Sequence, residues 1–412
     1  MTYSTDAIST KKNMFWNSFG SLTYFGCQWL MTVLVVRLSG GFSDAGVLAL
    51  VMSIYNIFQP FASYRLYTFQ VSDVTQENTT GEYLAFRTIT CFGAFSVCAL
   101  YAFGICSFGT FLAVVLFCLF KGISLLIEVW HAKEQLSGRM DYMGKSLALQ
   151  GALSLGSFSA VLYTLHNIQL AILSMVVATL MVAILYDLPR YSSFERFHFG
   201  ISLEKAIVLI RQCFPIVLSA VAFSVALSIG RQYLSYLYGE DLLGIYASIA
   251  APAAIVQMGA TYIYTPLLSI FAQHYINGNK KAIIHLFRKT VVGILLVGVL
   301  ATALLRLLAP WIFPILFGSD IQPYLYLLEP IMGLTVVTAF AWFANDLLVA
   351  MRSFVGSVAG NVFALIVAIP STYYCVNVWD MNGVSIAGII ACIAGLLVMV
   401  CFLNREVSRV QE

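Results

Sequence analysis

Long apolar segments, separated by short polar connections, dominate the 412-residue sequence. Apolar residues make up 60% of the chain and charged residues only 10%, against roughly 25% charged residues in an ordinary soluble domain. One membrane-spanning helix takes about 20 apolar residues, so the apolar content suffices for about twelve. The composition predicts an all-α integral membrane protein. It excludes a soluble globular enzyme, a disordered chain and a disulfide scaffold.

Apolar runs bounded by charged residues, glycine and proline predict twelve transmembrane helices. They are expected near residues 13–37, 46–69, 84–106, 110–131, 145–165, 168–187, 210–237, 243–271, 289–309, 323–348, 354–377 and 383–403. The first run is too long for the core of a signal peptide. A polar connection separates six helices from six, which predicts an N-terminal six-helix bundle (1–190), a cytoplasmic linker (191–210) and a C-terminal six-helix bundle (211–412).

The basic residues are distributed very unevenly between the two sides of these spans. Of the 22 lysines and arginines, seventeen lie on one side and only Arg37 lies on the other; the remaining four lie inside spans. Cytoplasmic connections carry the excess of basic residues in membrane proteins. We therefore predict a multi-pass protein of the inner (cytoplasmic) membrane, with both termini in the cytoplasm.

The two predicted bundles share short sequence echoes. Residues 41–46 and 239–244 both have two glycines separated by four residues, with acidic residues between them, at an offset of 198. The pairs Phe86-Arg87 and Phe287-Arg288 repeat at an offset of 201. Similar glycine-flanked turns also arise by chance. An internal repeat of six spans would give both bundles the same orientation, with a substrate site between them near the midplane, as in transporters.

Seven charged residues fall inside the predicted spans, where each costs roughly 2.5–3.5 kcal/mol unless it has a partner or an aqueous cavity. They are Arg65, Lys121, Glu128, Arg231, Arg306, Glu329 and Asp346.

Four of these residues are the candidate substrate-binding residues: Arg65, Lys121, Glu128 and Arg231. Lys121 and Glu128 are seven residues apart on one predicted helix and would share a face. The three basic residues predict a cationic, water-filled cavity, and basic side chains bind phosphate strongly. For Arg65 the alternative is that its side chain extends to the membrane surface.

The other charged residues in spans have structural interpretations. Arg306 and Glu329 lie near the outer ends of neighbouring helices, which predicts an ion pair. Asp346 lies close to the cytoplasmic surface and is expected to be solvated.

The sequence gives no support for a catalytic, metal-binding or cofactor-binding site. Nine scattered cysteines and five histidines show no metal-ligand spacing. Residues 138–146 look like a phosphate-binding loop, but five residues instead of four separate the glycines, and no strand precedes them. A net charge of +3 gives no reason to expect a nucleic-acid partner. We expect no enzyme activity, metal or cofactor.

Several stretches resemble bacterial polysaccharide-biosynthesis flippases, which move lipid-linked oligosaccharides and belong to the multidrug, oligosaccharidyl-lipid and polysaccharide exporter superfamily. The stretches are residues 12–17, 36–38, 65–73, 138–146, 230–233 and 239–246. The resemblance covers essentially the whole chain. It implies two bundles around a cationic central cavity and transport by alternating access.

The resemblance implies translocation of a polyprenyl-pyrophosphate-linked repeat unit from the cytoplasmic to the outer leaflet, for O-antigen, capsule or exopolysaccharide synthesis. The implied partners are undecaprenyl-pyrophosphate-linked oligosaccharide, membrane lipids, a glycan polymerase and glycosyltransferases. The twelve predicted helices count against the peptidoglycan precursor, because some lipid-II flippases have additional helices. The alternatives are a cation-coupled multidrug antiporter of the same superfamily and, with less support, an intramembrane glycan polymerase or acyltransferase.

Overall fold

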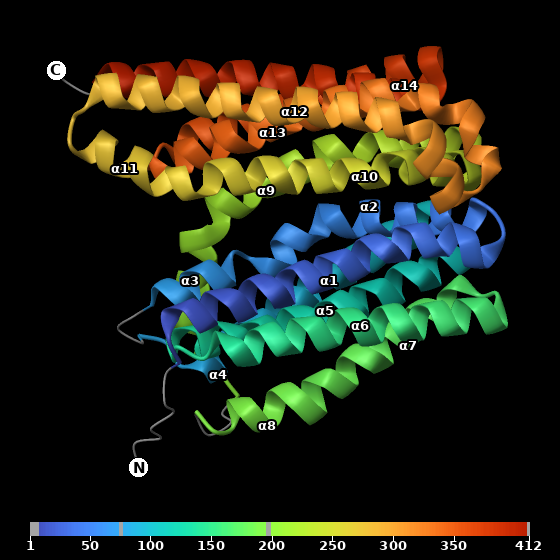
Figure 1. Ribbon diagram of the computed structural model, residues 1–412. Helices are drawn as coiled ribbons and strands as arrows, with labels where there is room; N and C mark the ends of the chain where they lie inside the picture. The colour runs from blue at the N-terminus through green and yellow to red at the C-terminus, as the bar shows by residue number, and fades with distance from the viewer. Residues whose placement is uncertain (1–7, 74–76, 195–198, 410–412) are drawn as a thin grey trace. The chain divides into compact units, whose positions relative to one another are not determined.

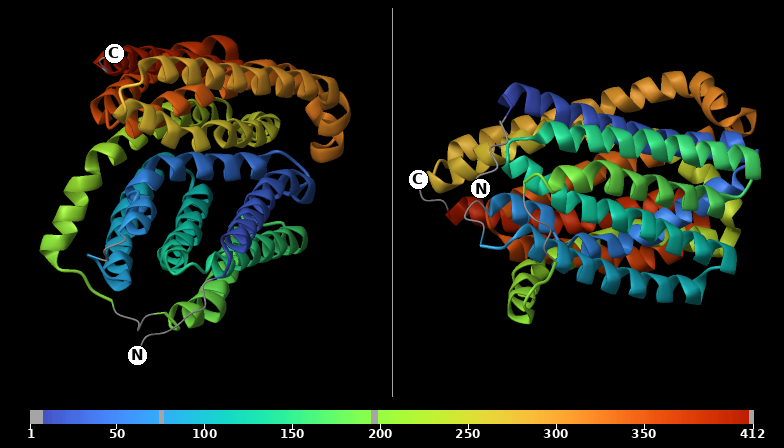
Figure 2. Two further views of the ribbon diagram at one scale, coloured as in Figure 1. Left: turned by 60° about the vertical axis from the view of Figure 1, so that its left-hand side comes forward. Right: turned by 90° about the horizontal axis from the view of Figure 1, so that it is seen from below.

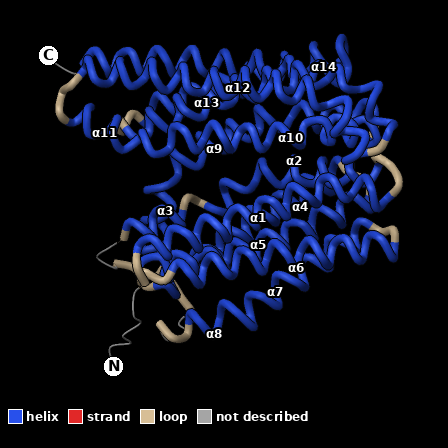
Figure 3. The backbone as a smooth tube through the Cα atoms, viewed as in Figure 1, coloured by secondary structure: helices blue, strands red, loops and turns tan. Residues whose placement is uncertain are grey.

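The computed structural model describes residues 8–73, 77–194 and 199–409. The chain divides into two compact units, Met1–Val217 and Leu218–Glu412. Figure 3 shows helices joined by short loops throughout the described ranges. Eleven of the described helices are long and apolar enough to cross a membrane. The predicted all-α membrane fold is therefore confirmed.

The predicted number of twelve spans agrees with these eleven helices because the last one contains two spans. Helix α14 (Phe354–Arg409) is interrupted by non-helical backbone at Trp379 and Asp380. The interruption falls between the predicted helices 354–377 and 383–403.

The first unit contains the first six spans and the start of α9 (Figure 1). Its helices are α1 (Thr10–Ser39), α2 (Ser43–Ser63), α3 (Leu66–Ser72), α4 (Thr80–Ile105), α5 (Phe108–Leu136), α6 (Met140–Leu165), α7 (Ile168–Val182), the π-helix η1 (Ala183–Asp187) and α8 (Leu188–Tyr191).

The second unit contains most of α9 and all later helices. They are α9 (Leu203–Tyr238), α10 (Glu240–Tyr264), the 3₁₀ helix η2 (Thr265–Leu267), α11 (Leu268–Ile276), α12 (Lys280–Phe317), the 3₁₀ helix η3 (Ser319–Leu327), α13 (Leu328–Ala350) and α14. Figure 2 shows the helices of each unit from two further directions.

Two helices begin earlier than predicted because their first turns are polar. Helix α9 begins at Leu203, within the stretch predicted as a linker, and α12 begins at Lys280 instead of near 289. Hydrophobicity marks only the part of a helix that crosses the apolar core. The polar start of α12 is capped by Asn279, whose side chain accepts a hydrogen bond from the backbone N–H of Ala282 at 3.0 Å.

Glycines bring α1 and α6 into close contact. A Cβ atom added to Gly20 would lie within 3 Å of the Gly144 backbone, and one added to Gly144 would meet the Trp16 carbonyl equally closely. Small residues allow such backbone approach in membrane bundles. Because Gly144 lies within helix α6, residues 138–146 do not form a phosphate-binding loop.

The two units repeat the same pattern of neighbouring helices. In the first unit α2, α4 and α5 pack against one another, and in the second unit α10, α12 and α13 do the same. The first and fifth spans also pack together in both units. Helix α1 packs on α6, and Ser219 of α9 accepts a hydrogen bond of 2.8 Å from Asn361 of α14. The predicted internal repeat is therefore present in the packing.

The two sequence echoes fare differently in the structure. Both glycine turns join the first and second spans of a unit. Gly239 begins the second turn with a positive φ, whereas in the first unit the glycine with positive φ is Gly40, one residue before the turn. The two arginines of the second echo have different environments: the side chain of Arg87 is fully buried, whereas Arg288 is exposed.

Candidate functional site

The second predicted helix is broken near its C-terminal end. Tyr64 and Arg65 both have positive φ, at 47° and 54°, and they separate α2 from α3 four residues after Pro60. A left-handed residue other than glycine costs roughly 1–2 kcal/mol. The break also removes the helical hydrogen bonds of nearby carbonyl groups, which must find other donors inside an apolar bundle.

Arg87 supplies those donors from α4. Its Nη1 donates to the carbonyl oxygens of Ala62, at 3.3 Å, and Ser63, and its Nη2 lies 2.7 Å from Glu128 Oε2. The Arg87 side chain is 0% exposed. Glu128, a candidate substrate-binding residue, is therefore the counter-ion of a buried arginine that holds the broken helix.

Lys121 has no such counter-ion. Its Nζ donates to Tyr24 Oη at 3.3 Å and Gln28 Oε1 at 3.4 Å, both on α1. It also lies 4.8–5.6 Å from the ring centroids of Tyr24, Phe117 and Phe120, which are cation–π distances. No acidic residue among the described residues forms an ion pair with Lys121. Lys121 and Glu128 are on one helix, but the structure does not join them.

Arg231 lines a cavity of about 210 Å³ within the second unit. Tyr246, Gln257, Thr335 and Thr338 also line this cavity, which we call the Arg231 cavity. The lining residues include no acidic side chain in the described part of the chain. The Nε2 of Gln257 is buried without a hydrogen-bond partner among the described residues. The cavity thus offers a guanidinium and an amide N–H to a ligand that accepts hydrogen bonds.

The remaining charged residues of the spans have the following environments. Arg65 is exposed at the break between α2 and α3. Arg306 and Glu329 form the predicted ion pair, with 2.9 Å between Arg306 Nη1 and Glu329 Oε1. Asp346 accepts a hydrogen bond of 3.1 Å from the hydroxyl of Tyr264, so it has a protein partner that sequence reasoning did not foresee.

Sequence reasoning missed the roles of Arg87 and Gln257. Arg87 was counted among the basic residues on the cytoplasmic side, and the full burial of its side chain was not foreseen. The signal was present, since residue 87 lies within the predicted span 84–106. Gln257 is uncharged, and no pattern in the sequence marks it as a cavity residue.

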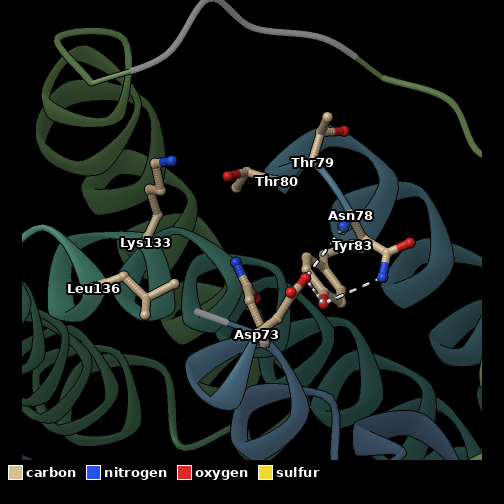
Figure 4. Close-up of a pocket in the computed structure, with 8 residues that line it drawn as sticks. Asp73, Asn78, Thr79, Thr80, Tyr83, Lys133 and Leu136 are labelled. Carbon is tan, nitrogen blue, oxygen red and sulfur yellow. Dashed lines mark hydrogen bonds between the residues drawn. The ribbon is translucent and has the colours of Figure 1, made fainter. Parts of the chain in front are cut away.

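A second, smaller pocket lies at the turn between α3 and α4 (Figure 4). Its volume is about 60 Å³, far below the roughly 300–1,000 Å³ of small-molecule sites. Asp73 occupies its floor and accepts hydrogen bonds from Tyr83 Oη at 2.7 Å and from the backbone N–H of Glu77 at 3.0 Å. These bonds fix the turn, so we interpret this pocket as structural.

The chain is similar to a protein that is described as acting in polysaccharide biosynthesis. The capsular polysaccharide biosynthesis protein CapF of Staphylococcus aureus is 25% identical over 301 residues, which cover 71% of this chain and 74% of that protein. No family model matches the chain.

Solved structures of transporters share the fold of this chain. A multidrug resistance MATE family transporter of the MOP superfamily, in an inward-facing conformation, has a TM-score of 0.72 at 15% identity, with coverage of 93% of this chain and 95% of that one. The lipid II flippase MurJ, in an inward closed conformation, has a TM-score of 0.72 at 9% identity, with coverage of 95% and 89%.

A third solved structure belongs to a MOP superfamily transporter from Pyrococcus furiosus. It has a TM-score of 0.62 at 16% identity, with coverage of 98% and 97%. The chain therefore has the fold of MOP-superfamily transporters, and the resemblance predicted from the sequence is confirmed. These solved structures are those of transporters and a flippase.

Proposed function

We propose that this protein moves a polyprenyl-pyrophosphate-linked oligosaccharide from the cytoplasmic to the outer leaflet, for the synthesis of a surface polysaccharide such as O-antigen, capsule or exopolysaccharide. In this proposal Lys121 and Arg231 bind the pyrophosphate, and Arg65 attracts it at the cytoplasmic end. Glu128 serves the site indirectly, by holding Arg87 at the broken helix.

The observation that carries the proposal is that two cations inside spans, Lys121 and Arg231, form no ion pair with an acidic residue in the described part of the chain. The buried Arg87 is neutralised by Glu128. Lys121 instead donates to the neutral groups of Tyr24 and Gln28, and Arg231 lines a cavity. A cation left unneutralised in an apolar bundle costs stability. An anionic substrate would compensate that cost, and a pyrophosphate accepts the donors that both sites present.

The relative from Staphylococcus aureus supports a glycan rather than another anionic lipid as the cargo. That protein is described as acting in capsular polysaccharide biosynthesis, and the MurJ structure is that of a lipid II flippase. A lipid-linked precursor combines the pyrophosphate, the glycan and the lipid in one substrate. A glycan polymerase and glycosyltransferases would then be its partners in the same process.

We further propose that the bundles 1–190 and 211–412, joined by residues 191–210, exchange between inward-open and outward-open states. Both termini would face the cytoplasm of the inner membrane, because seventeen basic residues lie on that side. Single cysteines at Ser43, Asp241 and Asp380, in a cysteine-free background, should react with an impermeant thiol reagent on intact spheroplasts. A cysteine at Asn279 should not react, and its labelling from outside would reverse the orientation.

The experiment for the substrate site uses a Lys121→Ala/Arg231→Ala double variant as the only copy in the cell. Surface polysaccharide should be lost, and lipid-linked repeat units should accumulate in the cytoplasmic leaflet, while the amount of inserted protein stays constant. An Arg288→Ala/Lys289→Ala variant is the matched control, since both residues are basic and exposed. Export at the wild-type rate by the well-expressed Lys121/Arg231 variant would refute the proposed site.

The second candidate is a multidrug antiporter, which the MATE structure favours with a TM-score of 0.72. An antiporter for cationic drugs would need a free acidic residue in its cavity. In the described chain, the residues that line the Arg231 cavity include none. Drug resistance conferred by expression, with normal surface polysaccharide in a deletion strain, would favour the antiporter.

A further inference from the structure

A cluster of ionisable side chains is buried where the cytoplasmic end of α5 meets the π-helix η1. It consists of His131, Glu134 and Asp187, which we call the buried triad. Their exposed fractions are 4%, 0% and 0%. In the sequence, His131 is one of five histidines without metal-ligand spacing, and no pattern singles out Glu134 or Asp187. The proposed function does not use any of them.

The polar atoms of the buried triad lack hydrogen bonds within the described part of the protein. Both carboxylate oxygens of Glu134 and both of Asp187 are buried without a hydrogen-bond partner. His131 Nε2 lies 3.6 Å from Asp187 Oδ1, which is an ionic contact but too long for a hydrogen bond. Trp130 Nε1, one helical turn from Glu134 on the same side of α5, is also buried and unpartnered.

Neighbouring charged groups are already engaged elsewhere. Arg190 donates to the carbonyl oxygen of Tyr186 at 2.8 Å, and its guanidinium lies 3.4 Å from the Tyr186 ring centroid. It interacts with Glu134 only electrostatically. The other ionisable groups near the triad are the ion pairs Arg139–Asp141 and Arg87–Glu128, Lys145 beside Asp141, and the tyrosines Tyr67, Tyr142, Tyr186 and Tyr191.

The charges of the buried triad do not balance when every group is ionised. A protonated His131 compensates one carboxylate, and Asp187 is the carboxylate that contacts it. An ionised Glu134 would then be a buried negative charge without a donor. An isolated charge of this kind costs several kcal/mol, and the group takes up a proton instead.

We propose that the buried triad is a proton-binding site, which holds one exchangeable proton on Glu134 while η1 is packed against α5. Release breaks the O–H bond of the Glu134 carboxyl, leaves the electron pair on its oxygen, and passes the proton to water. Water can reach Glu134 only if the packing between α5 and η1 opens. Proton release is therefore linked to a local opening at the cytoplasmic end of the first unit.

The local backbone supports an opening at η1. Residues Ala183–Asp187 form a π-helix, and single π-helical turns within α-helices occur frequently at functional sites. Ala183 of this segment and Tyr191 of the following α8 pack on Ile127 and Trp130 of α5. Because the packed state holds the extra proton, low pH should favour the packed state and high pH should favour opening.

The first test is infrared spectroscopy of the purified full-length protein in lipid nanodiscs. The wild-type spectrum at neutral pH should contain the C=O stretch of a protonated carboxyl, which disappears as the pH is raised. Glu134→Gln should remove this band. Asp141→Asn is the matched control, because Asp141 is buried in the same region but paired with Arg139 at 2.8 Å, and it should retain the band.

The second test is hydrogen exchange of the segment 183–194, corrected for the intrinsic pH dependence of amide exchange. Exchange should accelerate at high pH in the wild type and should be independent of pH in Glu134→Gln. If Glu134→Gln does not fold, Glu134→Asp keeps the carboxyl and should shift the infrared band. A band unchanged by Glu134→Gln or Glu134→Asp, or no pH-dependent exchange in the wild type, would overturn the proposal.

Discussion

Two basic residues of the first unit, Arg87 and Lys121, differ in how their positive charge is stabilised inside the apolar bundle. Arg87 of α4 is fully buried and is neutralised by Glu128 of α5 at 2.7 Å. Lys121, two turns away from Glu128 on α5, is held by a hydroxyl, an amide oxygen and three aromatic rings. Both cations lie inside membrane helices, but among the residues that the structure describes only Arg87 of the two has an acidic partner.

The difference separates a structural cation from a functional one. Arg87 uses its donors on the carbonyls of Ala62 and Ser63, at the break between α2 and α3, so its charge and its hydrogen bonds are consumed inside the protein. The charge of Lys121 remains available to a ligand. A residue that binds substrate is expected to reduce the stability of the empty protein, so the two residues should respond to neutralisation with opposite signs.

The largest effect is expected at the buried pair. Replacing Arg87 by Met leaves Glu128 without its counter-ion and the Ser63 carbonyl without the donor that Arg87 supplies. Breaking a buried ion pair costs roughly 3–5 kcal/mol. The free energy of unfolding, measured in mixed detergent micelles, should fall by that amount. Glu128→Gln should lower the free energy of unfolding by less, because the amide oxygen of the glutamine can still accept a hydrogen bond from Arg87.

A double variant provides the control for this prediction. Arg87→Met/Glu128→Leu removes both charges and should recover part of the lost stability, while the carbonyl of Ser63 still lacks the donor that Arg87 supplied. The carbonyl of Ala62 keeps the Thr90 hydroxyl as a donor at 2.9 Å. A stability loss equal to the sum of the two single losses would show that Arg87 and Glu128 act independently. The claim that Glu128 neutralises Arg87 would then be wrong.

A smaller effect of opposite sign is expected at Lys121. Lys121→Met removes an unpaired cation and leaves an apolar side chain of similar length among Phe117, Phe120 and Tyr24. Since cation–π contacts already offset part of the cost of the charge, the gain in unfolding free energy should be at most about 2 kcal/mol. The same unfolding assay measures it. A loss comparable to that of Arg87→Met would assign Lys121 a structural role.

The smallest effect is expected at the pair Arg306–Glu329. Its two side chains are 76% and 63% exposed, and exposed ion pairs contribute roughly 0–1 kcal/mol. Arg306→Gln should therefore leave both the unfolding free energy and polysaccharide export near wild-type values. A stability loss as large as that of Arg87→Met would mean that the presence of a partner does not distinguish structural from functional cations here.

The sequence was sufficient to predict the membrane fold, because apolar runs of about 20 residues specify spans directly. It also predicted the Arg306–Glu329 pair, since both residues lie near helix ends on the same side. Helix ends were less accurate at α9 and α12, where polar first turns extend beyond the membrane-spanning part. The break at Tyr64 and Arg65 was not predicted, because it depends on donors that α4 provides.

The environment of each charged residue could not be read from spacing alone. Lys121 and Glu128 lie seven residues apart on one helix, yet their side chains meet α1 and α4 respectively. Glu134 fell outside the predicted span 110–131, so the buried triad was not recognised. Partner choice depends on how helices far apart in sequence pack together, and one sequence carries no direct record of that packing.

The central claim, that unpaired cations bind a pyrophosphate, is tested most directly by ligand binding to the purified protein in nanodiscs. The ligands are undecaprenyl pyrophosphate and the corresponding alcohol, compared for the wild type and for Lys121→Met/Arg231→Met. We predict that the wild type binds the pyrophosphate but not the alcohol, and that the double variant binds it at least roughly tenfold more weakly, since one hydrogen bond to a charged group contributes about 1.5–3 kcal/mol. Equal affinity of the wild type for both lipids, or unchanged affinity in the double variant, would contradict the claim.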